Sequence, residues 1–188
     1  MEIKKLSPEL ADDYIGYMGG EAFADNADWA NCYCLESHFE SRWDDEPGFN
    51  SRDKAWELVL AGKLTGYLAY RNGKVIGWVN ANDKTAFCRL KEEWGAPEPG
   101  KKVKSIVCFV VAPSQREQGI ASALLERVCS DAERDGYDYV EGYPAAGVTF
   151  DTRHYRGPAS MYEKQGFTAQ KEIDGGHFRE LIMRKYLR

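Results

Sequence analysis

The sequence predicts an α/β domain with a mixed, mostly antiparallel sheet, flanking helices and one parallel pair of central strands. Two strand-like segments, 64–70 and 74–80, flank Asn72-Gly73, a dipeptide typical of two-residue hairpin turns. Segment 104–111 contains an unbroken apolar run, as expected of a strand buried on both faces. The clearest helical pattern of the chain and then another strand follow it, which predicts a right-handed crossover between parallel strands.

Length and composition favour one globular domain. The chain has 188 residues, about the size of a single domain. Its apolar fraction of 43% excludes intrinsic disorder, and no apolar run is long enough for a membrane span. We expect one domain over residues 1–188, with an N-terminal part (1–62), a central sheet (63–143) and a C-terminal part (144–188).

The N-terminal elements are predicted from local signals. A short strand over 3–6 precedes a helix that begins after Ser7 and ends near Met18. Residues 21–50 lack a clear period but are rich in aromatic and cysteine side chains, which suggests short helical pieces around apolar anchors. Another helix is expected over 52–61.

The C-terminal half begins with the strongest helix. Apolar side chains recur at helical spacing over 120–132, and Gly136 follows the end of this helix. An antiparallel pair joined at Gly175-Gly176 is expected to close the fold. The remaining predictions are a strand, a helix and the two strands of that pair, over 137–143, 158–165, 167–173 and 178–186.

Charge and N-terminal sequence limit the function classes. There are 25 Lys and Arg against 30 Asp and Glu, a net charge of −5, which disfavours a nucleic acid as the main ligand. The N-terminus lacks the apolar segment of a secretory signal, so we expect a cytoplasmic protein that is not membrane-bound. As its oligomeric state we expect a monomer or a homodimer. The five cysteines are an odd, scattered set, which we interpret as reduced thiols.

Residues 110–121 carry the most informative chemistry. A buried strand ends there, the chain turns, and the strongest helix begins. The first turn of a helix has unpaired N–H groups and partial positive charge, so it favours an anion such as phosphate. Gly119 and Ala121 allow close approach to the backbone, and Arg116 adds donors. Alternatively, Gly119 only eases a tight turn.

The segment Arg116-Glu117-Gln118-Gly119-Ile120-Ala121 resembles the Arg/Gln-x-x-Gly-x-Gly/Ala signature of the GCN5-related N-acetyltransferase (GNAT) superfamily. The preceding hairpin with Gly77-Trp78, the helix after the signature and the stretch 162–167 are also similar, in the same order. The resemblance covers roughly 64–182.

The resemblance implies acetyl-CoA as co-substrate and a central strand whose parallel neighbour splays away. The backbone of that strand would pair with the pantetheine arm, and the start of the helix with Arg116 would hold the diphosphate. The cofactor-binding residues implied are Phe109, Val110, Val111, Arg116, Glu117, Gln118, Gly119, Ile120, Ala121 and Ser122.

The implied activity is acetyl transfer to a primary amine of a small molecule or peptide, by direct attack in a ternary complex. The alternative is a non-catalytic acyl-CoA sensor or partner-binding module with the same fold. A third possibility is an enzyme that transfers a longer acyl group or makes an ester. An amine must lose a proton and a thiolate must gain one, so a base and an acid are expected.

Two catalytic candidates follow. Tyr162 lies where the superfamily often has the tyrosine that protonates the leaving sulfur, although an aromatic residue there can equally be core packing. Glu141 lies on the neighbouring strand and points away from Val140, as a base or as an exposed carboxylate. Rival bases are Glu21, Asp25, Asp28, Glu36 and Asp83.

Zinc ligands of the right type lie close together at Cys32, Cys34 and His38. Because a tetrahedral zinc site needs a fourth ligand, we expect no metal there. We interpret these thiols as apolar packing in the wall of the acceptor pocket. Tyr155 stands where relatives often have asparagine, and 144–157 is longer than their connection, as a lid, a substrate loop or a plain excursion.

Overall fold

The structure is a computed structural model that describes residues 1–39, 48–88, 95–146, 155–174 and 179–187. A seven-stranded sheet has the order β1-β2-β3-β4-β5-β7-β6. Strands β4 and β5 are parallel, and the other neighbours are antiparallel. The strands are β1 (Glu2–Lys5), β2 (Gly66–Arg71), β3 (Lys74–Asp83), β4 (Val103–Val111), β5 (Tyr139–Gly142), β6 (Thr168–Asp174) and β7 (Arg179–Tyr186).

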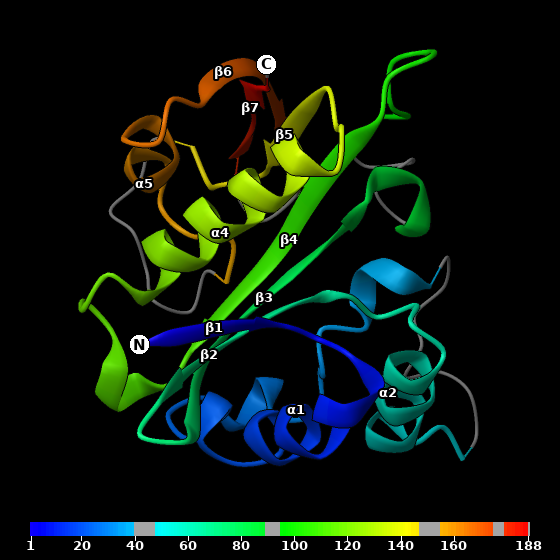
Figure 1. The fold of residues 1–188 in the computed structure, drawn as a ribbon, viewed down its shortest axis with the longest axis vertical. Helices are drawn as coiled ribbons and strands as arrows, with labels where there is room; N and C mark the ends of the chain where they lie inside the picture. The colour runs from blue at the N-terminus through cyan, green and yellow to red at the C-terminus, as the bar shows by residue number, and fades with distance from the viewer. Residues whose placement is uncertain (40–47, 89–94, 147–154, 175–178, 188) are drawn as a thin grey trace.

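Helices cover both faces of the sheet. Figure 1 shows α4 and α5 on one side of the strands, and α1 and α2 on the other. The α-helices are α1 (Ala11–Met18), α2 (Ser51–Leu60), α4 (Ile120–Arg134) and α5 (Ala159–Glu163). The 3-10 turns are η1 (Pro8–Leu10), η2 (Glu21–Phe23), η3 (Ala27–Trp29), η4 (Glu36–His38), η6 (Lys84–Ala86) and η7 (Pro113–Gln115).

The predicted fold class is confirmed. Asn72 and Gly73 have φ angles of 52° and 75°, so both central residues of the β2–β3 turn adopt the left-handed conformation that this hairpin requires. Strand β4, helix α4 and strand β5 form the predicted crossover with parallel strands. Helix α4 buries one apolar stripe that includes Leu124, Leu125 and Val128.

Some boundaries differ from the sequence prediction. The helix expected up to Met18 is divided into η1 and α1, because Leu10 leaves the helical region with a ψ of 11°. Helix α2 begins at Ser51, and the side chain of Asn50 accepts from the Asp53 amide as its N-cap. The turn at Gly175-Gly176 and positions 147–154 of the long connection lie outside the described residues.

The parallel pair separates halfway along β4. Its register with β5 ends where Ile106 pairs with Gly142, whereas β4 continues to Val111. On its other edge β4 pairs with β3 as far as Val111, with an irregularity between Asn80 and Ala81. The last part of β4 therefore has one edge in the sheet ladder and one edge beyond the reach of β5.

Two main apolar clusters lie on opposite faces of the sheet. One joins α1 and α2 to residues such as Trp78 and Val110, and the other joins α4 and α5 to residues such as Phe109 and Val140. Alternate residues of β4 thus enter different cores. Among the residues that the structure describes, no helix combines the length and apolarity that a membrane crossing requires.

Candidate active site

A cavity of about 390 Å³ lies where the open edge of β4 meets the start of α4 and the start of α5. Most of the sequence-predicted cofactor residues contribute to its wall, although Val110 and Gln118 do not. The lining residues are Phe109, Val111, Gln115, Arg116, Glu117, Gly119, Ile120, Ala121, Ser122, Tyr155, Gly157, Pro158, Ser160, Met161 and Lys164.

The start of α4 presents main-chain donors to this cavity. Gly119 is the N-cap residue with φ 76°, and Glu117 also adopts a positive φ of 61°. No described side chain caps the helix, and its first backbone bond runs from the Ala123 amide to the Gly119 carbonyl. The amides of the first turn therefore have no partner further back in the helix, as an anion site requires.

Arg116 lies beside this turn and is held in place. Its guanidinium donates to both carboxylate oxygens of Asp25, at 2.5 and 3.0 Å, and its Nε donates to the carbonyl of Val111 at 3.2 Å. The hydrogen bond from Arg116 lowers the pKa of Asp25. Gln118 instead contacts Arg71 and the carbonyl of Ser114, away from the cavity.

The open edge of β4 is partly occupied by the chain itself. The Phe109 amide donates to the Tyr155 carbonyl at 2.5 Å. The Ala112 amide bonds to Ile76 on β3, so alternation places the backbone groups of Val111 on the same edge as those of Phe109. Val110 lies differently from the other predicted residues of β4, because its backbone faces β3 and its side chain is buried among α1 and α2.

Tyr162 lies behind the cavity wall. Its side chain is buried, its ring packs edge-on to Phe109 at 6.2 Å between centroids, and its hydroxyl donates to the Arg156 carbonyl at 2.9 Å. A Cβ on Gly142 would lie 2.3 Å from this ring, so only glycine fits beside it. Burial raises the pKa of Tyr162, and the hydroxyl remains protonated at neutral pH.

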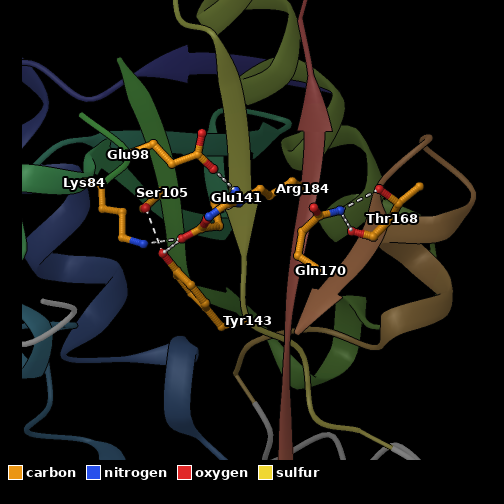
Figure 2. Close-up of polar contacts among 8 residues, drawn as sticks. All are labelled: Lys84, Glu98, Ser105, Glu141, Tyr143, Thr168, Gln170 and Arg184. Carbon is orange, nitrogen blue, oxygen red and sulfur yellow. Dashed lines mark hydrogen bonds and ion pairs between the residues drawn. The ribbon is translucent and has the colours of Figure 1, made fainter. Parts of the chain in front are cut away.

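Glu141 is buried in a charged network, which excludes the interpretation of an exposed carboxylate. Figure 2 shows its carboxylate between Lys84, whose Nζ lies at 2.5 Å, and Arg184, whose Nε lies at 2.6 Å. The hydroxyl of Tyr143 also donates to it at 2.7 Å. Both oxygens of Glu141 are therefore engaged, and Glu141 does not line the cavity.

Tyr143 extends the network to the central strand. Its hydroxyl lies 2.9 Å from that of Ser105 on β4, and both side chains are fully buried. At the outer end, Arg184 also pairs with Glu98. The network joins η6, β4, β5 and β7. Its buried charges are paired and hydrogen-bonded, which offsets the free-energy cost of removing them from water.

The rival carboxylates are dispersed. Asp25 pairs with Arg116, and Asp83 accepts from the amide and hydroxyl of Thr85 at the start of η6. Glu21, Asp28 and Glu36 lie in three separate 3-10 turns. Asp25 is therefore tied to the cavity wall through its hydrogen bonds with Arg116.

The face covered by α1 and α2 holds a second polar cluster. The Sγ atoms of Cys34 and Cys108 are 3.2 Å apart, and Asn80 bonds to the Cys34 carbonyl and to His38. Burial lowers the pKa of His38 to about 4, so its imidazole is neutral at neutral pH. Over the described ranges, no three His, Cys, Asp or Glu side chains gather as metal ligands would.

Sequence reasoning missed much of the wall opposite α4. Tyr155, Gly157 and Met161 line the cavity, with Gly157 at φ 75° against the Met161 side chain. These residues belong to the long connection before α5 and to α5 itself. The departure at Tyr155 from the family pattern was the available signal, because a new side chain there marks a changed contact.

Comparison with known proteins relates this geometry to one family. The family described as Acetyltransferase (GNAT) family matches residues 27–167. No curated protein matches significantly. The similar solved structures include a ribosomal-protein-alanine N-acetyltransferase from Brucella melitensis, with a TM-score of 0.61, 15% identity and 100% of both chains covered.

Two further structures are similar. The protein yncA from Salmonella typhimurium, solved with its cofactor acetyl-CoA, has a TM-score of 0.59 and 15% identity, covering 100% of this chain and 94% of that chain. An aminoglycoside 6'-acetyltransferase type Ii has a TM-score of 0.59 and 16% identity, with 99% and 97% covered. At these identities the likeness is one of fold.

Proposed function

Because the chain belongs to the GNAT family of acetyltransferases, we propose that it transfers an acetyl group from acetyl-CoA to a primary amine. The observation that carries this proposal is the cavity at which the open edge of β4 and the uncapped start of α4 meet. Strand edges recognise extended amide chains, and helix starts recognise phosphate. Acetyl-CoA combines both chemistries in one molecule.

The residues present fit this co-substrate. The first-turn amides of α4, from Ile120 to Ser122, would hold the diphosphate, and Arg116 would join them by leaving Asp25. The β4 edge at Phe109 and Val111 would pair with the pantetheine amides, for which the Phe109 amide must exchange the Tyr155 carbonyl for a ligand carbonyl. When bound, acetyl-CoA supplies the activated thioester.

The chain's own residues would then supply the general acid and the general base. Tyr162 is the proposed acid, since its hydroxyl is protonated and its ring packs on Phe109 at the splay. To serve, the hydroxyl must turn from the Arg156 carbonyl toward the leaving sulfur. Glu141 stays a predicted base, and its pairing with Lys84 and Arg184 means that it would act only as part of that network.

The acceptor is proposed to be a small-molecule or peptide amine that approaches from the α1 and α2 face. Among similar folds, one acts on an aminoglycoside and another on a ribosomal-protein alanine, so the fold is compatible with both classes. The net charge of −5 favours a cationic acceptor through long-range attraction.

Two measurements test the proposal. Calorimetry should show acetyl-CoA binding, and a thiol-release assay against a panel of amines should show amine-dependent release of CoA. Absence of binding at millimolar acetyl-CoA would overturn the proposal. Binding without thiol release from any amine would favour the alternative, a non-catalytic acyl-CoA-binding module.

The acid role is tested by Tyr162→Phe, which keeps the ring that packs on Gly142 and Phe109. We expect kcat to fall by about 100-fold, because general acid catalysis contributes on that order, with the Kd for acetyl-CoA unchanged. A variant with full kcat would show that Tyr162 is core packing only. Phe167→Leu, in the same ring cluster, is the packing control.

A further inference from the structure

We propose that Cys34 and Cys108 form an oxidisable pair that a hydroperoxide closes into a disulfide. The two Sγ atoms lie 3.2 Å apart, which is about 1.2 Å more than the length of a disulfide bond. Both thiols are reduced in the structure, and they belong to segments 74 residues apart in the chain. Disulfide formation would have to close this remaining gap between the sulfurs.

The backbone around Cys34 is built to hold this thiol in place. Tyr33 and Cys34 have φ angles of 43° and 49°, a conformation that costs energy for residues other than glycine. Two buried donors fix this turn: the Tyr14 hydroxyl bonds to the Tyr33 carbonyl at 2.7 Å, and the Asn80 amide bonds to the Cys34 carbonyl at 3.0 Å.

Asn80 links the turn to the strand that carries the second thiol. It is fully buried on β3 and pairs in register with Cys108 on β4. One scaffold residue therefore positions Cys34 directly against its neighbour in the sheet. Packing of apolar thiols requires no such strained turn, so the geometry favours a pair that is held for reaction.

The chemistry requires one oxidant. Cys108 is half-buried whereas Cys34 is 5% exposed, so Cys108 is the sulfur that meets the peroxide. Its thiolate attacks one oxygen of hydrogen peroxide, forming an S–O bond as the O–O bond breaks, and the departing hydroxide takes up the proton that the thiol released and leaves as water. The Cys34 sulfur then attacks Cys108, forming the S–S bond as the S–O bond breaks and a second water leaves. Two thiols thus give two electrons and two protons to one hydroperoxide.

The disulfide would have a consequence for turnover, and this extension rests on the proposed function. Cys108 immediately precedes Phe109, and Cys34 belongs to the segment on the opposite face from the cavity. The cross-link would therefore restrain the acceptor face of β4 while leaving the start of α4 unchanged. We expect at least a twofold change in kcat, with the Kd for acetyl-CoA altered by less than twofold.

The test is a peptide map of the full chain. After removal of reductant, the protein is treated with hydrogen peroxide, alkylated in denaturant and digested. We expect a Cys34–Cys108 cross-linked peptide, a fall from five free thiols to three, and reversal by dithiothreitol. Sulfinic acids without a cross-link, or a link through Cys32 or Cys88, would overturn the proposal.

Variants sharpen this result. Cys34→Ser and Cys108→Ser should each abolish the cross-link, whereas Cys32→Ser, which removes the rival thiol two residues away, should retain it. If a pair variant does not fold, the map of the natural chain still decides. An oxidised, cross-linked protein with unchanged kcat would refute the extension alone, and absence of all turnover in the reduced protein would refute the proposed function alone.

Discussion

Between Lys104 and Ile106, strand β4 pairs with both β3 and β5, whereas beyond Ile106 its second edge faces a cavity and the carbonyl of Tyr155. The first part contributes Ser105 to the buried network with Tyr143 and Glu141. The second part faces the first turn of α4 and the small residues Gly119, Ala121 and Gly157 across the cavity. We call 103–106 the closed end of β4, because β5 covers its second edge, and 107–111 the open end, because β5 does not reach it.

This contrast separates stability from binding. Changes at the closed end should mainly reduce the free energy of unfolding, because they leave buried charges without their partners. Changes at the open end should mainly reduce affinity for acetyl-CoA, because the residues there face a cavity. Four substitutions test this separation in order of expected effect.

At the closed end, Glu141→Gln should lower the free energy of unfolding by about 3–5 kcal/mol, because Lys84 and Arg184 lose their buried counter-charge. Denaturant titration measures this loss. The control is Glu172→Gln, which breaks an exposed pair with Arg179 and should cost less than about 1 kcal/mol. Equal losses in the two variants would contradict a structural role for the network.

At the open end, Gly119→Val should weaken acetyl-CoA binding by about 100-fold, because a branched side chain disfavours φ 76° and projects where the first-turn amides face the ligand. Gly136→Val is the matched control, since Gly136 follows the other end of α4 with φ 72°. It should carry similar backbone strain with unchanged affinity by calorimetry. A matching loss of affinity in the control would assign the effect to strain.

Arg116→Glu should weaken binding by about 30-fold, as expected for loss of a charge-assisted hydrogen bond. The effect should shrink at high salt, because screening weakens attraction between exposed charges. Arg52→Glu makes the same change in net charge on the exposed surface of α2 and serves as the control. Equal effects would mean that overall charge, and not the site, controls affinity.

The smallest expected effect has the opposite sign. Asp25→Asn should tighten acetyl-CoA binding by about threefold, because Arg116 no longer has to leave an ion pair that is worth only about 0.2–1 kcal/mol. Calorimetry at low salt measures the change. Weaker binding would instead show that Asp25 aligns the guanidinium for the ligand.

The open end was largely predictable from sequence. Apolar runs, Gly119 and the helical period define β4, the turn and α4, and these are local signals within about 30 residues. The family signature added the co-substrate. The resemblance implied Phe109, Val110 and Val111 as a set, whereas in the structure Phe109 and Val111 line the cavity and Val110 does not.

The closed end was not predictable. The partners of Glu141 are Lys84 and Arg184, which lie 57 and 43 residues away and meet it only after the sheet has formed. A single Glu in a strand indicates exposure unless its partners are known. The contact between Phe109 and Tyr155 was equally unpredictable, because it joins β4 to the distant connection before α5.

The bond from the Phe109 amide to the Tyr155 carbonyl covers part of the open edge of β4. A bare strand edge invites pairing with other chains, and a carbonyl from the protein's own backbone blocks that route. If acetyl-CoA binds as proposed, a ligand carbonyl would replace that of Tyr155, so this contact would add little net affinity. In that proposal, affinity would come mainly from the phosphates and from apolar burial, and release of product would restore the bond between Phe109 and Tyr155.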